Sequence, residues 1–191
     1  PKFPSLVRNV PVIEQAAIGR FGGHGIFSTL TGKDGIVRSV PSLFGHDNEY
    51  FPTLSIEMLR IATGRQTVLA RVNEAGMVGV AVAKGLEVRT DKIGQIWPYF
   101  SKHDPDKYVS AVDVLNGNVD PAKVKGKLTI VGTSAVGLRD IRSIPTERDI
   151  PGVEVHAQLI EAIVHQKYLV RLFPKVLLED STPLKIKPFS K

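Results

Sequence analysis

Residues 67–91, TVLARVNEAGMVGVAVAKGLEVRTD, contain three short β-branched runs separated by Gly, Asn or Asp. Such runs between turn-forming residues are typical of successive β-strands. The pattern predicts strands at 67–72, 76–83 and 86–91, and the run IGQIWPYF predicts another at 93–100. In the second run, glycine and alanine alternate with valine, so we expect one face of this strand to pack closely against a neighbour.

Helical patterns lie on both sides of these runs. The segment PTLSIEMLRIATG, residues 52–64, has proline near its first turn and glycine just beyond its end, as is common for helices. Residues 152–169 form an amphipathic pattern that predicts a helix packed on a sheet. Its expected apolar face is Val153, Ala157, Ile160 and Val164, and its expected polar face is Glu154, Gln158, Glu161 and His165. Shorter helical pieces are expected within 4–18, interrupted at Pro11, and within 106–117.

Two further patterns complete the expected fold. Alternating runs around the sequence GKDG, residues 32–35, predict a β-hairpin over 26–41, followed by a polar loop at 45–51. Leu128 to Val131 read as a buried strand that runs into a glycine-containing loop. Strands interspersed with helices predict a single α/β domain, with a mixed sheet, flanking helices and an attached β-hairpin.

Composition restricts the possible partners. The 191 residues have a net charge of +6, but the basic residues are spread along the chain and are not interleaved with aromatic ones, so we expect no nucleic-acid partner. The longest apolar run, 77–83, is far shorter than the roughly 20 residues of a membrane helix. The absence of cysteine excludes disulfides and thiolate chemistry. Because the chain opens with Pro1 and has no leader-like segment, we expect it to be a piece of a longer protein.

The loop GTSAVGLRD, residues 132–140, resembles a phosphate-binding turn after a strand. However, Leu138 and Arg139 stand where a nucleoside-triphosphate loop needs lysine and then serine or threonine. A weaker anion-binding role for Thr133, Ser134 and Arg139 remains open, and the alternative is a strand exit closed by hydroxyl-to-backbone hydrogen bonds.

The remaining polar residues favour structural roles. Asp140 and Arg142 suit an ion pair or a turn cap. The five histidines show no metal-binding spacing, so we expect neither a metal nor a cofactor. His156 borders the apolar face of its helix, which favours a packed, hydrogen-bonded ring. Trp97 lies in an aromatic cluster and is expected in the core.

The order of these segments resembles the second class of CHASE domains, which are extracellular sensory domains associated with cyclases and histidine kinases. The resemblance spans residues 25 to about 171. Its strongest anchors are Asp34, Gly35, Arg38, Pro52, Gly132, Asp140, Pro151, Gly152 and His156. The opening strand and helix that are usual in this family are not recognised before residues 4–18, so we expect a truncated copy.

The resemblance implies a periplasmic sensory domain at 1–174, followed by a tail or juxtamembrane segment at 175–191. It further implies membrane anchoring in the full-length protein, an unknown small-molecule ligand, and a cytoplasmic cyclase or kinase as output. No catalytic residue is expected in this domain. The predicted ligand-binding residues are Thr133, Ser134, Arg139, Asp140 and Arg38.

Two other functions remain open at this point. One is a phosphate-binding or hydrolytic α/β enzyme that uses the loop at 132–140. The other is an assembly module that forms a homodimer through the helix at 152–169 or through an exposed strand.

Overall fold

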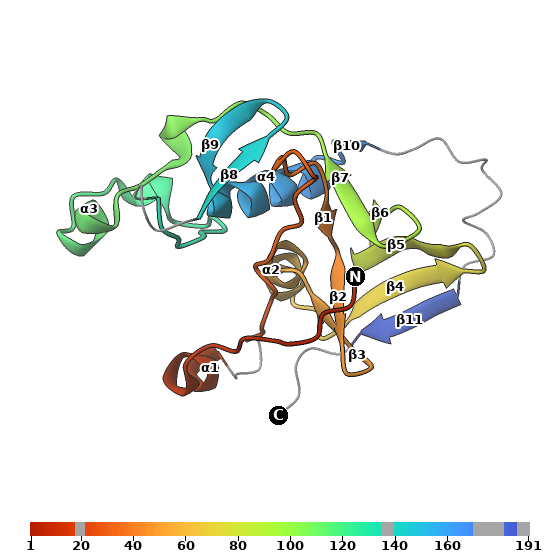
Figure 1. The fold of residues 1–191 in the computed structure, drawn as a ribbon. Helices are drawn as coiled ribbons and strands as arrows, with labels where there is room; N and C mark the ends of the chain where they lie inside the picture. Colours follow the sequence, from red (N-terminus) through yellow and green to blue (C-terminus); the bar gives the residue numbers. More distant parts are fainter. Residues whose placement is uncertain (18–21, 135–139, 170–181, 187–191) are drawn as a thin grey trace.

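The computed structural model describes residues 1–17, 22–134, 140–169 and 182–186. Its largest sheet has the strand order β11-β4-β5-β6, and all its neighbouring strands are antiparallel. The strands are β4 (Val68–Asn73), β5 (Gly76–Ala83), β6 (Leu86–Arg89) and β11 (Thr182–Ile186). The strands predicted from residues 67–91 are therefore confirmed, and β11 brings the end of the chain into the same sheet (Figure 1).

The predicted close approach along β5 is also confirmed. A side chain at Gly79 would place its Cβ 2.9 Å from the backbone oxygen of Val88 on β6. Val80 and Val82 point into the core, where they are fully or almost fully buried. Glycine at position 79 thus allows β6 to lie against β5 while the valines fill the interior.

Three smaller antiparallel sheets complete the described fold. A three-stranded sheet has the order β1-β7-β10, and the hairpins β2–β3 and β8–β9 form the other two. The bounds are β1 (Val40–Pro41), β2 (Leu43–His46), β3 (Glu49–Pro52), β7 (Gln95–Pro98), β8 (Ile141–Ile144), β9 (Glu147–Pro151) and β10 (Tyr168–Leu169).

The helices are α1 (Pro11–Ala17), α2 (Leu54–Ala62), α3 (Ala111–Leu115) and α4 (Gly152–Val164), with short 3₁₀ turns η1 (Pro105–Lys107) and η2 (Pro121–Lys123). Helices α2 and α4 pack on each other and on the sheets, whereas α1 and α3 stand apart from them (Figure 1). Helices α2 and α4 share one apolar core with the sheets, which confirms the predicted single α/β domain.

Helix α4 is buried on more sides than its amphipathic pattern predicts. Val155, Leu159 and Ile163 are fully buried and form its core-facing stripe. Glu154 and Gln158, predicted on the polar face, are also buried. The predicted orientation of the helix was therefore wrong, because α4 is covered by α2 on one side and by β6 to β9 on others.

For the predicted hairpin over 26–41, the structure confirms the turn but not the pairing of the two strands. Its turn forms, since the amide of Gly32 donates to the carbonyl of Ile36 (2.9 Å) and Gly35 has the positive φ of +78° that glycine favours. The flanking runs do not pair with each other. Ile26 instead forms a parallel bridge with Thr53, and Ile36 forms one with Ser143. Each flank is tied to a different part of the fold, so no two-stranded ladder develops.

Four other expectations were wrong. The expected polar loop at 45–51 lies mostly in the β2–β3 hairpin, whose turn residues Asp47 and Asn48 both have positive φ. Pro11 begins α1 rather than interrupting a helix, since a first-turn proline loses no intrahelical hydrogen bond. Trp97 is 37% exposed, and its Nε1 donates to Asp91 (3.1 Å). The expected buried strand Leu128 to Val131 is absent, and Val131 is 91% exposed.

Candidate functional site

The start of α4 is built on a close approach between two backbones. The amide of Gly152 donates to the carbonyl of Asp140, which directly precedes β8, at 2.7 Å. A Cβ on residue 152 would lie only 2.1 Å from Oδ1 of Asp140. Glycine is therefore favoured at this position, because a side chain here would have to displace the Asp140 carboxylate. That carboxylate lies 3.3 Å from the guanidinium of Arg142, which confirms the expected ion pair.

Within the first turn of α4, the carboxylate of Glu154 accepts hydrogen bonds from three side chains. Its Oε2 accepts from Nδ1 of His103 (2.7 Å) and from the hydroxyl of Tyr108 (2.5 Å). Its Oε1 accepts from the side-chain amide of Gln158 (2.8 Å). Only 7% of Glu154 is exposed, so these three donors replace the water that the carboxylate loses on folding.

These contacts alter two acid–base equilibria. Burial by itself would raise the pKa of Glu154, but the hydrogen bonds from Tyr108, His103 and Gln158 outweigh it and lower the pKa below its usual value. Burial, together with the hydrogen bond to Glu154, raises the pKa of the Tyr108 phenol. At neutral pH the site therefore holds a carboxylate anion and a protonated phenol.

A hollow of about 340 Å³ opens beside this network. His103, Tyr108 and Pro105 form one wall, and the β9 strand forms the other. The complete lining is His103, Pro105, Tyr108, Ser134, Glu147, Arg148, Asp149, Ile150 and Pro151. The hollow combines apolar walls with hydroxyl, imidazole, carboxylate and guanidinium groups, a mixture that suits a small polar ligand.

The backbone of β9 is irregular where it borders the hollow. Asp149 has φ of +58°, a left-handed conformation that residues other than glycine seldom adopt. The register of the β8–β9 pair shifts between Arg142 and Ile144, opposite this part of β9. Such bulges redirect side chains and are frequent beside binding sites.

A second polar cluster lies deeper, between α2 and α4. His156 is fully buried, and its Nε2 donates to the carbonyl of Phe27 (2.9 Å). Because a carbonyl can only accept, Nε2 carries the proton and Nδ1 can accept from the hydroxyl of Ser55 (3.0 Å). The packed, hydrogen-bonded ring predicted for His156 is confirmed. Burial lowers its pKa, against the opposing effects of the Phe27 carbonyl and of Asp140.

The structure separates the predicted ligand-binding residues. Ser134 lines the hollow, and Thr133 lies next to it on the exposed surface. Asp140 lies beneath Gly152, and Arg38 forms a two-pronged ion pair with Asp34 on the exposed turn (2.9 and 2.7 Å). Arg139 falls outside the described residues. The grouping of all five into one site thus stays a prediction.

Sequence reasoning missed the residues at the centre of the site. His103 and Tyr108 lie in irregular segments around η1, where no periodic pattern marks them. Glu154 was assigned to a solvent-facing stripe of its helix. Gln158 lies four residues later on the same side of the helix. This spacing was the available signal of a hydrogen bond between the two side chains, because polar groups on a buried helix face are normally hydrogen-bonded to one another.

In the described part of the chain, no cluster of three or more histidine, aspartate or glutamate side chains could hold a metal ion. Among those residues, no helix has both the length and the apolar character needed to cross a membrane.

Comparison with known protein families identifies a sensory class of protein. The family model of the CHASE2 domain matches residues 3–179, so the chain belongs to the CHASE2 family, whose members are extracellular sensory domains of signalling receptors. The resemblance inferred from the sequence is therefore confirmed. No curated protein and no solved structure matches the chain. The family is sensory rather than catalytic, which favours a sensory role over the enzymatic alternative.

Proposed function

We propose that this chain is the periplasmic input domain of a transmembrane receptor, and that a small-molecule ligand binds in the hollow beside Glu154. In the complete receptor, the domain is anchored to the membrane and controls a cytoplasmic adenylate or diguanylate cyclase or a sensor kinase. Membership of the CHASE2 family supports the sensory role. Homodimer formation is a further element of this proposal, since two-fold symmetric dimers are the commonest protein oligomers.

The observation that carries the proposed binding site is the double role of His103 and Tyr108. Both side chains line the hollow, and both donate hydrogen bonds to the buried carboxylate of Glu154. A ligand that contacts either ring would compete with this carboxylate or reinforce its contacts. Binding in the hollow is therefore coupled directly to the first turns of α4.

Further polar contacts extend this coupling along α4. The amide of Ser101 donates to Oε1 of Gln158 (2.9 Å), and Nζ of Lys107 lies 2.7 Å from Oε1 of Glu161. Residues 101–108 are thus attached to α4 along one side of the helix. Because α4 packs on α2 and on strands β6 to β9, a shift of residues 101–108 reaches the core. Useful signalling requires a preference for one of two conformations of about 1–3 kcal/mol.

The predicted ligand-binding residues fit this proposal to different degrees. Ser134 would contact the ligand directly, because it lines the hollow. Asp140 would act from beneath α4, through its contact with Gly152. Thr133 and Arg38 are proposed as outer contacts, and Arg139 stays a prediction.

Calorimetric titration of the purified chain with amino acids, sugars and inorganic phosphate tests the proposed site. For a compound that binds, Tyr108→Phe and Ser134→Ala should each weaken the affinity by about tenfold, because each variant removes one polar contact. Tyr99→Phe is the matched control, since Tyr99 is 67% exposed and does not line the hollow. If Tyr108→Phe and Ser134→Ala both leave the affinity unchanged, the ligand does not bind in the hollow. If Asp140→Ala leaves the affinity unchanged, Asp140 does not contribute to ligand binding.

A further inference from the structure

The charged residues of the hollow come from a bulge in strand β9. Two residues of β9, Arg148 and Asp149, lie opposite a single residue of β8, Ser143, because the register shifts there. Such a two-to-one arrangement interrupts the alternation of side chains along a strand. Within the bulge, Asp149 adopts a left-handed backbone with φ of +58°. Two neighbouring side chains of opposite charge can therefore border the same hollow, and both of them line it.

The charges of this bulge are not used within the described part of the chain. Glu147, Arg148 and Asp149 all line the hollow, and none of them forms an ion pair or a side-chain hydrogen bond with another described residue. By contrast, Arg142 on the paired strand β8 has Asp140 as its partner. The bulge thus presents one guanidinium and two carboxylates whose partners come from solvent or from a ligand.

The balance of these charges indicates the charge of the ligand. Two carboxylates and one guanidinium leave the lining with an excess of negative charge, when histidine is counted as neutral. The Glu154 carboxylate lies behind His103 and Tyr108 and has the same sign. An anion such as inorganic phosphate meets this excess of like charge, which disfavours its binding. The lining instead matches a ligand with two positive groups and one negative group.

An α-amino acid with a second ammonium group has this set of charges. Its α-carboxylate and α-ammonium are carried by one carbon, and they match the adjacent guanidinium of Arg148 and carboxylate of Asp149. Glu147 is then available for the side-chain ammonium. Pro105 and Ile150 supply apolar wall for the methylene groups between the charges. The volume of about 340 Å³ lies near the lower end of the range for ligand pockets, which suits a ligand of this size.

We propose that the hollow binds an α-amino acid that carries a second ammonium group on its side chain. The α-carboxylate pairs with Arg148, the α-ammonium with Asp149 and the side-chain ammonium with Glu147. This inference rests on the proposed ligand-binding role of the hollow and specifies the class of ligand. The bound molecule lies between β9 and the wall of His103 and Tyr108, whose side chains bond to the first turn of α4.

Calorimetric titration of the purified chain with L-lysine and three analogues tests the proposal. Each analogue lacks one of the three charges. L-Norleucine lacks the side-chain ammonium, L-lysinamide lacks the carboxylate, and Nα-acetyl-L-lysine lacks the α-ammonium. L-Lysine should bind, and each analogue should bind about tenfold more weakly, because each loses one charged contact.

Variants assign each charge of the ligand to its partner. Arg148→Gln should weaken the binding of L-lysine about tenfold and leave that of L-lysinamide unchanged. Asp149→Asn should likewise weaken L-lysine and leave Nα-acetyl-L-lysine unchanged, and asparagine tolerates the left-handed backbone at this position. Arg89→Gln and Asp47→Asn are the matched controls, since both residues are exposed, neither lines the hollow, and Asp47 also has a positive φ of +46°. Both controls should leave every affinity unchanged.

The outcomes separate this inference from the proposed function. If L-lysine does not bind but a sugar or phosphate does, and Tyr108→Phe weakens that binding, the ligand class is wrong while the hollow remains the binding site. If L-lysine binds equally well to the wild type, Arg148→Gln and Asp149→Asn, the bulge does not recognise it and the inference is overturned. Equal affinities of L-lysine and L-norleucine would also overturn it.

Discussion

His156 connects three separate segments through one ring, because it bonds to Phe27 and Ser55 from its place on α4. The ring is fully buried, so its polar atoms depend on these partners. His156→Leu leaves the Phe27 carbonyl without its donor and should lower the free energy of unfolding by about 2–4 kcal/mol. Urea denaturation measures this loss. His165→Leu, at an exposed position just after the same helix, should change stability by less than about 0.5 kcal/mol.

The same residue predicts how stability depends on pH. Burial lowers the pKa of folded His156 below the unfolded value of 6.5, so the unfolded chain binds the proton first as the pH falls. The contribution of His156 is therefore complete above pH 6.5 and is lost as the pH falls below that value towards the folded pKa. The free energy of unfolding, measured by denaturation across this range, should decline more steeply in the wild type than in His156→Leu. Parallel curves for the two proteins would contradict the prediction.

At the scale of elements, the start of α4 depends on the absence of a side chain at residue 152. Gly152→Ala would place Cβ 2.1 Å from Oδ1 of Asp140, so we expect a loss of about 1–3 kcal/mol in the free energy of unfolding. Asp140→Ala removes the obstructing atoms. The double variant should therefore be more stable than the sum of the two single effects predicts. Simple additivity in this double-mutant cycle would mean that the two residues are not in contact.

The elements differ in how far the sequence could predict them. Strands β4 to β7 and helix α2 were predictable because turn residues separate them and their patterns are local. The β2–β3 hairpin was missed although Asp47 and Asn48 are residues that tolerate the left-handed conformation of its turn. The flanks of the 32–35 turn were assigned to each other because sequence cannot show that Ile26 and Ile36 pair with distant segments.

The candidate site was less predictable than the fold for a physical reason. The packed, hydrogen-bonded ring of His156 could be inferred from a local pattern, but Glu154 is covered by His103 and Tyr108, which come from a distant segment. That covering is a tertiary contact between segments about fifty residues apart in the chain. A helical pattern alone therefore placed Glu154 in solvent. His103 and Tyr108, which come from irregular backbone, gave no pattern that could correct this.

At the scale of the whole molecule, the sheets and the helices α2 and α4 form one body around a shared core, to which Ile186 near the end of the chain contributes. Strand β11 pairs along its whole length with β4, from Thr182 opposite Val72 to Ile186 opposite Val68. The segment predicted as a tail after residue 174 thus includes part of the sheet, while the domain boundary itself stays a prediction.

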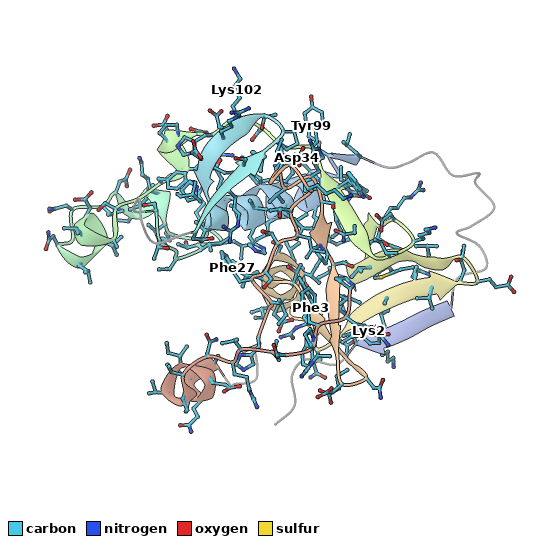
Figure 2. All side chains as sticks on the ribbon, in the orientation of Figure 1. Lys2, Phe3, Phe27, Asp34, Tyr99 and Lys102 are labelled. Carbon is cyan, nitrogen blue, oxygen red and sulfur yellow. The ribbon has the colours of Figure 1, made fainter. Side chains whose placement is uncertain are left out.

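We propose that this domain, as a member of an extracellular sensory family, functions on the outer side of the cytoplasmic membrane. Because the 191 residues contain no cysteine, a single introduced cysteine is the only thiol of this region that can be labelled. Lys102 is suitable, since it is exposed and extends away from the body of the molecule (Figure 2). Lys102→Cys in the full-length protein should react with a membrane-impermeant maleimide in intact cells. Labelling that occurs only after the cytoplasmic membrane is permeabilised would contradict this location.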